Sequence, residues 1–141
     1  MQAMEISRTG LDVEWKRLEV IADNLANLST TRTASGAPYQ AMRLVSGPKA
    51  SFAQLVGAPQ TGGLSGVMTY GVEPTTAQPR RVYDPSHPHA DAQGFVTYPG
   101  VDHAQEMTLM VKTGRAYEAN IVAMNAARQM YAKAMELGKR G

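Results

Sequence analysis

The sequence predicts an α+β fold, in which long N- and C-terminal α-helices pack as an antiparallel, coiled-coil-like pair around a small β-rich central insert. All eight prolines of the 141 residues lie between Pro38 and Pro99, and proline inside a helix removes a backbone donor and clashes with the preceding turn. The two proline-free ends repeat apolar residues at helical spacing, whereas the middle places short apolar runs between turn residues. We therefore divide the chain into an N-terminal helix (1–31), a middle subdomain (32–99) and a C-terminal helix (100–141).

The N-terminal segment carries one narrow apolar stripe. Apolar residues recur at every seventh position from Met4 to Leu25, and others follow three or four positions later, which is the spacing of one helix face. The hydroxyl-rich run at 29–31 is expected to end the helix. One stripe offsets little of the roughly 1–2 kcal/mol of backbone entropy lost per residue, so this helix needs a partner. The predicted stripe consists of Met4, Leu11, Trp15, Leu18, Ile21, Leu25 and Leu28.

The C-terminal segment has the same seven-residue period. Met110, Tyr117, Met124 and Tyr131 are seven apart, and Ile121 follows Tyr117 by four. Methionine is flexible and repacks, which suits a surface that must fit non-identical neighbours. Ordinary core packing explains the same stripe equally well.

The ends of this second helix are also marked in the sequence. Asp102 is a candidate N-cap, with Gln105 three residues later as in a capping box. Gly138 is expected to end the helix, because glycine is common where helices stop.

Four asparagines lie beside the two stripes: Asn24, Asn27, Asn120 and Asn125. Asparagine is a poor helix former, and inside helical assemblies it usually fixes register through buried hydrogen bonds or caps an end. Asn27 fits a C-cap. For the other three we favour register-fixing, and we include all four with the two stripes in a predicted assembly interface.

The proline-rich middle contains four candidate strands. These are Tyr39–Val45, Gly66–Glu73, Arg80–Tyr83 and Gly94–Tyr98, each short and bounded by turn residues. Residues 46–66 contain Gly-Pro, Ala-Pro and Gly-Gly and are expected to form a long mobile loop.

Composition excludes several classes of protein. The chain has no cysteine and a net charge of +2, which leaves no thiolate chemistry and no basic footprint for nucleic acid. The sequence contains no run of 18 apolar residues, so it predicts no transmembrane helix. The start lacks the basic-then-apolar layout of a cleavable signal, so the protein is expected in the cytosol unless another export path is used. The glycine-rich run 61–66 lacks the lysine of a phosphate loop, and we expect no cofactor.

One cluster resembles a metal or acid–base site. His87, His89 and Asp91 alternate along the chain, and with Asp84 or His103 they have the residue types of a zinc site. The prolines within the cluster favour a hydrogen-bonded turn instead. A small metal-dependent enzyme built on this cluster is therefore the alternative function, and we expect no catalytic residue and no resident metal.

Three separated motifs resemble one family. Ile21-Ala-Asp-Asn-Leu-Ala-Asn27 with the continuation to Tyr39 resembles the N-terminal signature of the flagellar rod and hook axial proteins, and Thr30-Thr-Arg-Thr33 is similar to its proximal-rod members. Residues 82–91 and 94–99 resemble the middle motif of these members, and 117–138 their C-terminal helix. The resemblance covers about residues 1–45 and 80–141.

The resemblance implies a structural subunit of the bacterial flagellar basal-body rod, whose terminal helices pack into a drive shaft that transmits torque for motility. It implies a place in the periplasmic space, reached through the flagellar type III export apparatus without a cleaved signal peptide. The implied partners are other rod proteins, copies of the chain itself, and the base-ring and adaptor proteins of the basal body. Export requires a chain that unfolds easily, so we expect marginal helices that fold on assembly.

Overall fold

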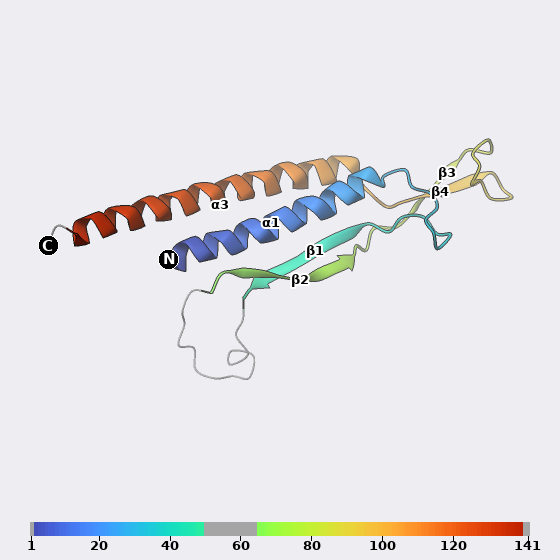
Figure 1. Cartoon of the computed structure of the whole chain (residues 1–141). Helices are drawn as coiled ribbons and strands as arrows, with labels where there is room; N and C mark the ends of the chain where they lie inside the picture. The colour runs from blue at the N-terminus through green and yellow to red at the C-terminus, as the bar shows by residue number, and fades with distance from the viewer. Residues whose placement is uncertain (1, 50–64, 140–141) are drawn as a thin grey trace, which may run out of the picture.

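The computed structural model describes residues 2–49 and 65–139, which form an elongated molecule (Figure 1). Two long helices lie side by side and run in opposite directions, so the predicted antiparallel helix pair is confirmed. In chain order the described elements are α1 (Gln2–Ala26), β1 (Met42–Pro48), β2 (Val67–Pro74), β3 (Arg80–Tyr83), β4 (Phe95–Tyr98) and α3 (His103–Gly138).

The described strands form two separate antiparallel hairpins and not one sheet. Strands β1 and β2 pair with each other and pack along α1. Strands β3 and β4 form the second hairpin, which projects beyond the end of the helix pair where α1 finishes and α3 begins (Figure 1). The insert therefore supports one helix along its length and extends the molecule at one end.

The sequence located all four strands but misplaced some of their ends. Arg80–Tyr83 is confirmed as β3. The predicted start of the 46–66 loop is wrong. Ser46–Pro48 continue β1 and pair with residues 67–69 of β2. A β-bulge after Val45 shifts the register there, which lets a strand continue through Gly47 and Pro48. The rest of the expected mobile loop, residues 50–64, lies outside the described residues.

The N-terminal helix ends at Ala26, earlier than the predicted boundary at residue 31. The last bonds of the helix tighten here: the Asn27 N–H still donates to the Asp23 carbonyl oxygen at 3.1 Å, but the Leu28 N–H donates to the Leu25 carbonyl oxygen at 3.3 Å, three residues back instead of four. The Asn27 side chain bridges this end, since its amide also donates to the Asp23 carbonyl oxygen at 2.9 Å and its oxygen accepts from the Thr30 hydroxyl at 3.1 Å. The chain then turns back, and the Tyr39 N–H donates to the Thr30 carbonyl oxygen at 3.0 Å.

The C-terminal helix begins as predicted. Asp102 is its N-cap, and its carboxylate accepts from the Gln105 N–H at 3.1 Å. The helix continues through Gly114 and ends at Gly138, 36 residues long against 25 for α1. Its last turns therefore extend past the N-terminal end of α1 (Figure 1).

Asn24 connects three parts of the chain. Its side chain is only 1 % exposed. Its amide nitrogen donates to the Met42 carbonyl oxygen at 2.8 Å and to Glu106 Oε2 at 3.2 Å. Its amide oxygen accepts from the Met42 N–H at 3.0 Å and the Tyr39 hydroxyl at 2.9 Å. All four hydrogen-bonding positions of the amide are thus filled, and they link α1 to the start of β1 and the first turn of α3.

The surroundings of the Tyr39 hydroxyl disfavour the phenolate, which extends to higher pH the range in which the phenol is a donor. Burial raises the pKa of Tyr39 above its usual value, and the carboxylates of Asp23 and Glu106 raise that pKa further. The folded chain therefore holds the phenol protonated, in the form that donates to Asn24.

We expect Asn24→Ala to lower the free energy of unfolding by about 2–3 kcal/mol, because it leaves buried backbone and side-chain groups without partners. Urea unfolding followed by circular dichroism measures this change. Asn27→Ala is the matched control, and we expect it to cost about 0.5–1 kcal/mol because its bonds are local and exposed. Equal losses in the two variants would contradict a special role for Asn24.

Candidate assembly interface

The predicted interface residues of α1 divide between the inside and the surface of the chain. Ile21 and Asn24 are buried within the protomer, and Trp15 is 55 % exposed. The remaining members are half-buried: Met4, Leu11, Leu18, Leu25, Asn27 and Leu28. The stripe read from the sequence is therefore only partly covered by the chain's own structure.

The corresponding residues of α3 show the same division. Tyr131 is 43 % exposed, and Asn125 is also exposed. The members that lie opposite α1 are half-buried: Met110, Tyr117, Asn120, Ile121 and Met124. Whether these surfaces meet another subunit stays a prediction.

The two helices approach each other closely at Gly10. A Cβ atom placed there would lie 2.7 Å from Asn120 Oδ1 and 2.9 Å from Asn120 Cγ. The Asn120 amide is itself fixed, because its nitrogen donates to the Ala116 carbonyl oxygen at 3.0 Å. Glycine in the middle of a helix lowers its stability, and here it makes room for the asparagine side chain of the other helix.

An aromatic pair marks one edge of the helix pair. The Trp15 and Tyr117 rings are 6.2 Å apart between centroids and tilted by 50°, and Trp15 Nε1 donates to Glu19 Oε1 at 3.0 Å. Tyr117 is half-buried beneath it. The large exposed area of Trp15 is unusual for an indole that already has one partner, and aromatic side chains of this kind commonly anchor protein interfaces.

A groove of about 620 Å³ lies between the N-terminal end of α1 and the facing part of α3. Met4, Met124 and Asn125, all predicted interface residues, are among those that line it. Beyond this groove α3 continues without α1, and its apolar side chains Tyr131 and Leu137 are 43 % and 72 % exposed. The groove and the end of α3 are both left uncovered by the described part of the chain.

The candidate metal cluster is a hydrogen-bonded turn. His89 Nδ1 lies 2.8 Å from the Thr31 hydroxyl, and His87 Nδ1 accepts from the His89 N–H at 3.0 Å. Asp91 forms an ion pair with Arg81 at 2.5 Å. Among residues 2–49 and 65–139 no three His, Cys, Asp or Glu side chains are grouped to hold a metal ion.

The acidic residues of this turn are stabilised as carboxylates by local donors. The Phe95 N–H lowers the pKa of Asp91 below its usual value, and the Gln93 N–H and Arg81 lower it further. The Ser86 side chain lowers the pKa of Asp84 in the same way. These are the interactions of turn formation in the β3–β4 hairpin.

Sequence reasoning missed several buried residues of the two helices. Ser7, Gly10, Val13 and Thr113 are buried but lie off the predicted stripes. Val13 faces β2 across a hollow that Thr69 also lines. Gly10 was the one residue of this group that the sequence could have flagged. Glycine inside a helix lowers its stability, so its presence there suggests that close packing requires it. The others depend on which face the hairpin covers, which the helix pattern alone does not show.

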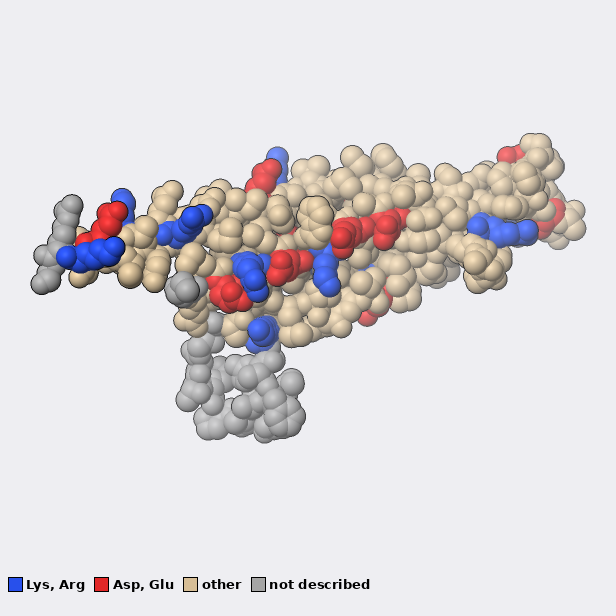
Figure 2. Space-filling view, viewed as in Figure 1, with Lys and Arg blue, Asp and Glu red and all other residues tan. Residues whose placement is uncertain are grey.

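Among the described residues no helix is both long enough and apolar enough to cross a membrane. Charged side chains instead follow the length of the molecule. Asp and Glu form a broken line along α1 on the face shown in Figure 2, with Lys and Arg between and beside them. The predicted interface is thus an apolar stripe flanked by charge on a water-exposed surface.

Comparison with known proteins identifies the two helical regions separately. The family model described as flagella basal body rod protein matches residues 4–32, and the model of the flagellar basal body rod FlgEFG protein C-terminal region matches residues 92–137. These matches contain most of α1 and nearly all of α3.

Full-length relatives carry the same description. The flagellar basal-body rod protein FlgC of Bacillus subtilis is 34% identical, and the alignment covers 97% of each chain. FlgC of Salmonella typhimurium is 34% identical over 99% of this chain and 98% of the relative. FlgC of Borreliella burgdorferi is 31% identical over 96% of this chain and 95% of the relative.

The contact between Gly10 and Asn120 predicts opposite effects of one substitution in two backgrounds. We expect Gly10→Ala to destabilise the natural chain by about 1–2 kcal/mol, because the new methyl group overpacks the contact. In an Asn120→Ala background the same substitution should stabilise by about 0.5–1 kcal/mol, the helix-propensity gain of alanine over glycine. Urea unfolding of the four chains measures both, and an equal effect in the two backgrounds would refute the contact.

The β3–β4 hairpin should lose stability in acid. Because the pKa of Asp91 is lowered in the folded chain, its contribution is complete above the ordinary aspartate value near 3.8 and is lost as the pH falls through the lowered folded pKa. Arg81→Gln should raise that pKa only part of the way, since the Phe95 and Gln93 N–H groups remain. Carboxyl ¹³C NMR titration measures it, and a complete return to the ordinary value would show that Arg81 alone sets the shift.

Proposed function

The chain belongs to the FlgC family of flagellar basal-body rod proteins, and from this premise we propose that it builds the proximal part of the rod and transmits torque along it by helix packing. It is a structural subunit of the flagellar basal-body rod. The family implies a structural role, and we propose that the chain catalyses no reaction.

The observation that carries the proposal is the uncovered end of α3. This helix keeps its apolar period beyond α1. Gly10 lies against Asn120 in the antiparallel pair, so Gln2, where α1 begins, comes level with about residue 128 of α3. Tyr131 and Met135, 43 % and 51 % exposed, continue the row of Met124 past that point, with no described helix beside them. Burial of apolar surface contributes roughly 25 cal/mol per Å², and such a row is left exposed when its partner is another molecule. We propose that neighbouring subunits cover it.

The weak core of the isolated chain supports the same role. The buried apolar residues among those described are few: Val13, Ile21, Ala41, Leu44 and Val96. A chain with so little burial unfolds readily, as passage through a narrow export channel requires. We propose that assembly supplies the burial that the protomer lacks, so that the helices become rigid in the rod.

Partners and place follow from the family. The family indicates assembly with other flagellar rod proteins. We propose further that copies of the chain itself and the base-ring and adaptor proteins of the basal body contact it. We also propose that it works in the periplasmic space and arrives through the flagellar type III export apparatus.

Substitution in the uncovered part of α3 tests the proposal. We expect Tyr131→Asp to abolish swimming and to remove the protein from purified basal bodies, because it places a charge in the apolar row that a neighbour must cover. The isolated chain should keep its helix content by circular dichroism, since α1 does not reach this part of α3.

Gln129→Asp is the matched control. Gln129 is exposed on the same overhang but lies about 200° around the helix from Tyr131, so its replacement should leave swimming intact. Normal swimming of the Tyr131→Asp strain would contradict the role of the row, and absence of the natural chain from basal bodies would contradict its place in the rod.

A further inference from the structure

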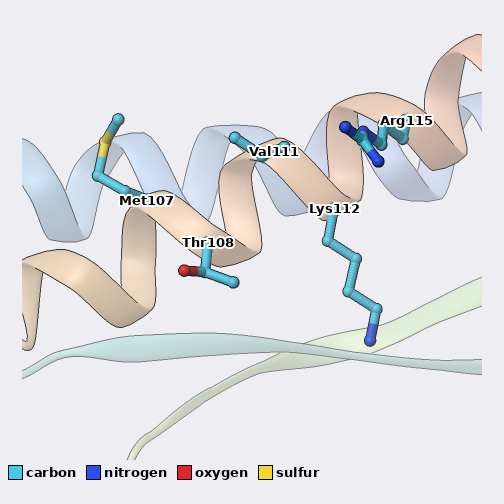
Figure 3. Close-up of a pocket in the computed structure, with 5 residues that line it drawn as sticks. All are labelled: Met107, Thr108, Val111, Lys112 and Arg115. Atoms are coloured by element: carbon cyan, nitrogen blue, oxygen red, sulfur yellow. The ribbon is translucent and has the colours of Figure 1, made fainter.

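Besides the overhanging end, α3 has a second uncovered apolar surface, on the side that faces away from α1. It is a groove of about 450 Å³ lined only by α3 residues, Met107, Thr108, Val111, Lys112 and Arg115. In Figure 3 these side chains follow one face of α3, with Met107, Val111 and Arg115 towards one edge, Thr108 and Lys112 towards the strands, and the α1 ribbon behind α3. Val111 is nine residues from Asn120, about half a turn around the helix, so the groove faces away from the contact with Gly10.

The groove combines an apolar floor with an unpaired basic edge. Met107 and Val111 are exposed. Lys112 and Arg115 are also exposed, and neither forms an ion pair with any residue of the described part of the chain. An occupant must therefore offer apolar surface together with negative charge.

The outer face of α1 has this composition. Asp12, Glu19 and Asp23 are exposed there, against one exposed base, Lys16, between residues 12 and 23. Asp12 lies two residues, or about 200°, from Gly10, so it points away from α3, and Glu19 lies on the same face seven residues later. Trp15, 55 % exposed, supplies the apolar surface beside them.

We propose that this face of α1 docks into the α3 groove of a second copy of the chain. Trp15 packs on Met107 and Val111 of the neighbour, while Asp12 and Glu19 approach the neighbour's Lys112 and Arg115. Because the two surfaces lie on opposite sides of one helix pair, the contact is heterologous and repeats from copy to copy. The inference rests on the proposed function, because it assumes that copies of the chain meet in the rod and names the two surfaces through which they do so.

Association in solution gives the first test. Trp15 is the single tryptophan, so its emission should shift to shorter wavelength as concentrated full-length protein associates. Lys112→Glu with Arg115→Glu should weaken association by about tenfold or more, since like charges then face each other. Lys133→Glu, an exposed base of α3 away from the groove, should leave association unchanged. An equal effect of the control and the groove variant would overturn the proposal.

Mixing two defective variants tests the head-to-tail geometry. Trp15→Ala impairs the docking face, and Lys112→Glu/Arg115→Glu impairs the groove, so each variant alone should associate at least about tenfold more weakly than the natural chain. Their mixture retains one intact face and one intact groove and should form a 1:1 dimer by sedimentation velocity, with no larger species. Failure of the mixture to dimerise when the natural chain associates would overturn the proposal.

A charge exchange in cells separates this inference from the proposed function. Asp12→Lys/Glu19→Lys and Lys112→Glu/Arg115→Glu should each remove the protein from purified basal bodies, and all four changes in one chain should restore it. Normal incorporation of both reversed variants, or loss without restoration, would overturn the contact between copies while the natural chain remains in the basal body. Absence of the natural chain itself would instead overturn the proposed function.

Discussion

The hydrogen bonds of Asn24 fix α1 against the start of β1 and the first turn of α3. A buried amide in a low-dielectric interior is costly unless all of its groups are paired, and here both partners of the Met42 backbone and the carboxylate of Glu106 must be in place at once. Sliding α3 along α1 by one turn, about 5.4 Å, would take Glu106 away from the amide. The asparagine thus sets the axial register of the two helices as well as the start of β1.

The exposed surfaces follow from this register. Fixing the first turn of α3 against Asn24 places Asn120 opposite Gly10 and brings Met124 to the N-terminal end of α1. Since α3 is the longer helix, the same alignment leaves Tyr131 and the residues after it without a cover. The overhang is therefore a consequence of where the buried amide lies, and its apolar row is the reason to propose a neighbour there.

The sequence predicts the elements well and the packing less well. Periodicity and proline placement are local properties, and they correctly predict two helices, the Asp102 cap and the β3 strand. The burial of Val13 and the exposure of Trp15 depend instead on which side of α1 the β1–β2 hairpin covers. That choice is made by contacts between residues far apart in the chain, such as the Arg17 guanidinium with the Ser46 hydroxyl at 2.8 Å. The apolar stripe predicted from the sequence of α1 therefore differs in its position around the helix from the face that is buried in the structure.

The distribution of charge decides how copies of such a chain can meet. A two-fold axis would bring identical faces together, setting the acidic face of α1 against itself or the basic groove of α3 against itself, and like charges in contact are destabilising. A head-to-tail contact pairs the acidic face with the basic groove and leaves the same two surfaces free at the ends of each new assembly. Charge asymmetry across one helix pair thus favours head-to-tail addition over a closed two-fold dimer. A subunit of a shaft needs this property, because each added copy must present the same surface as the one before it.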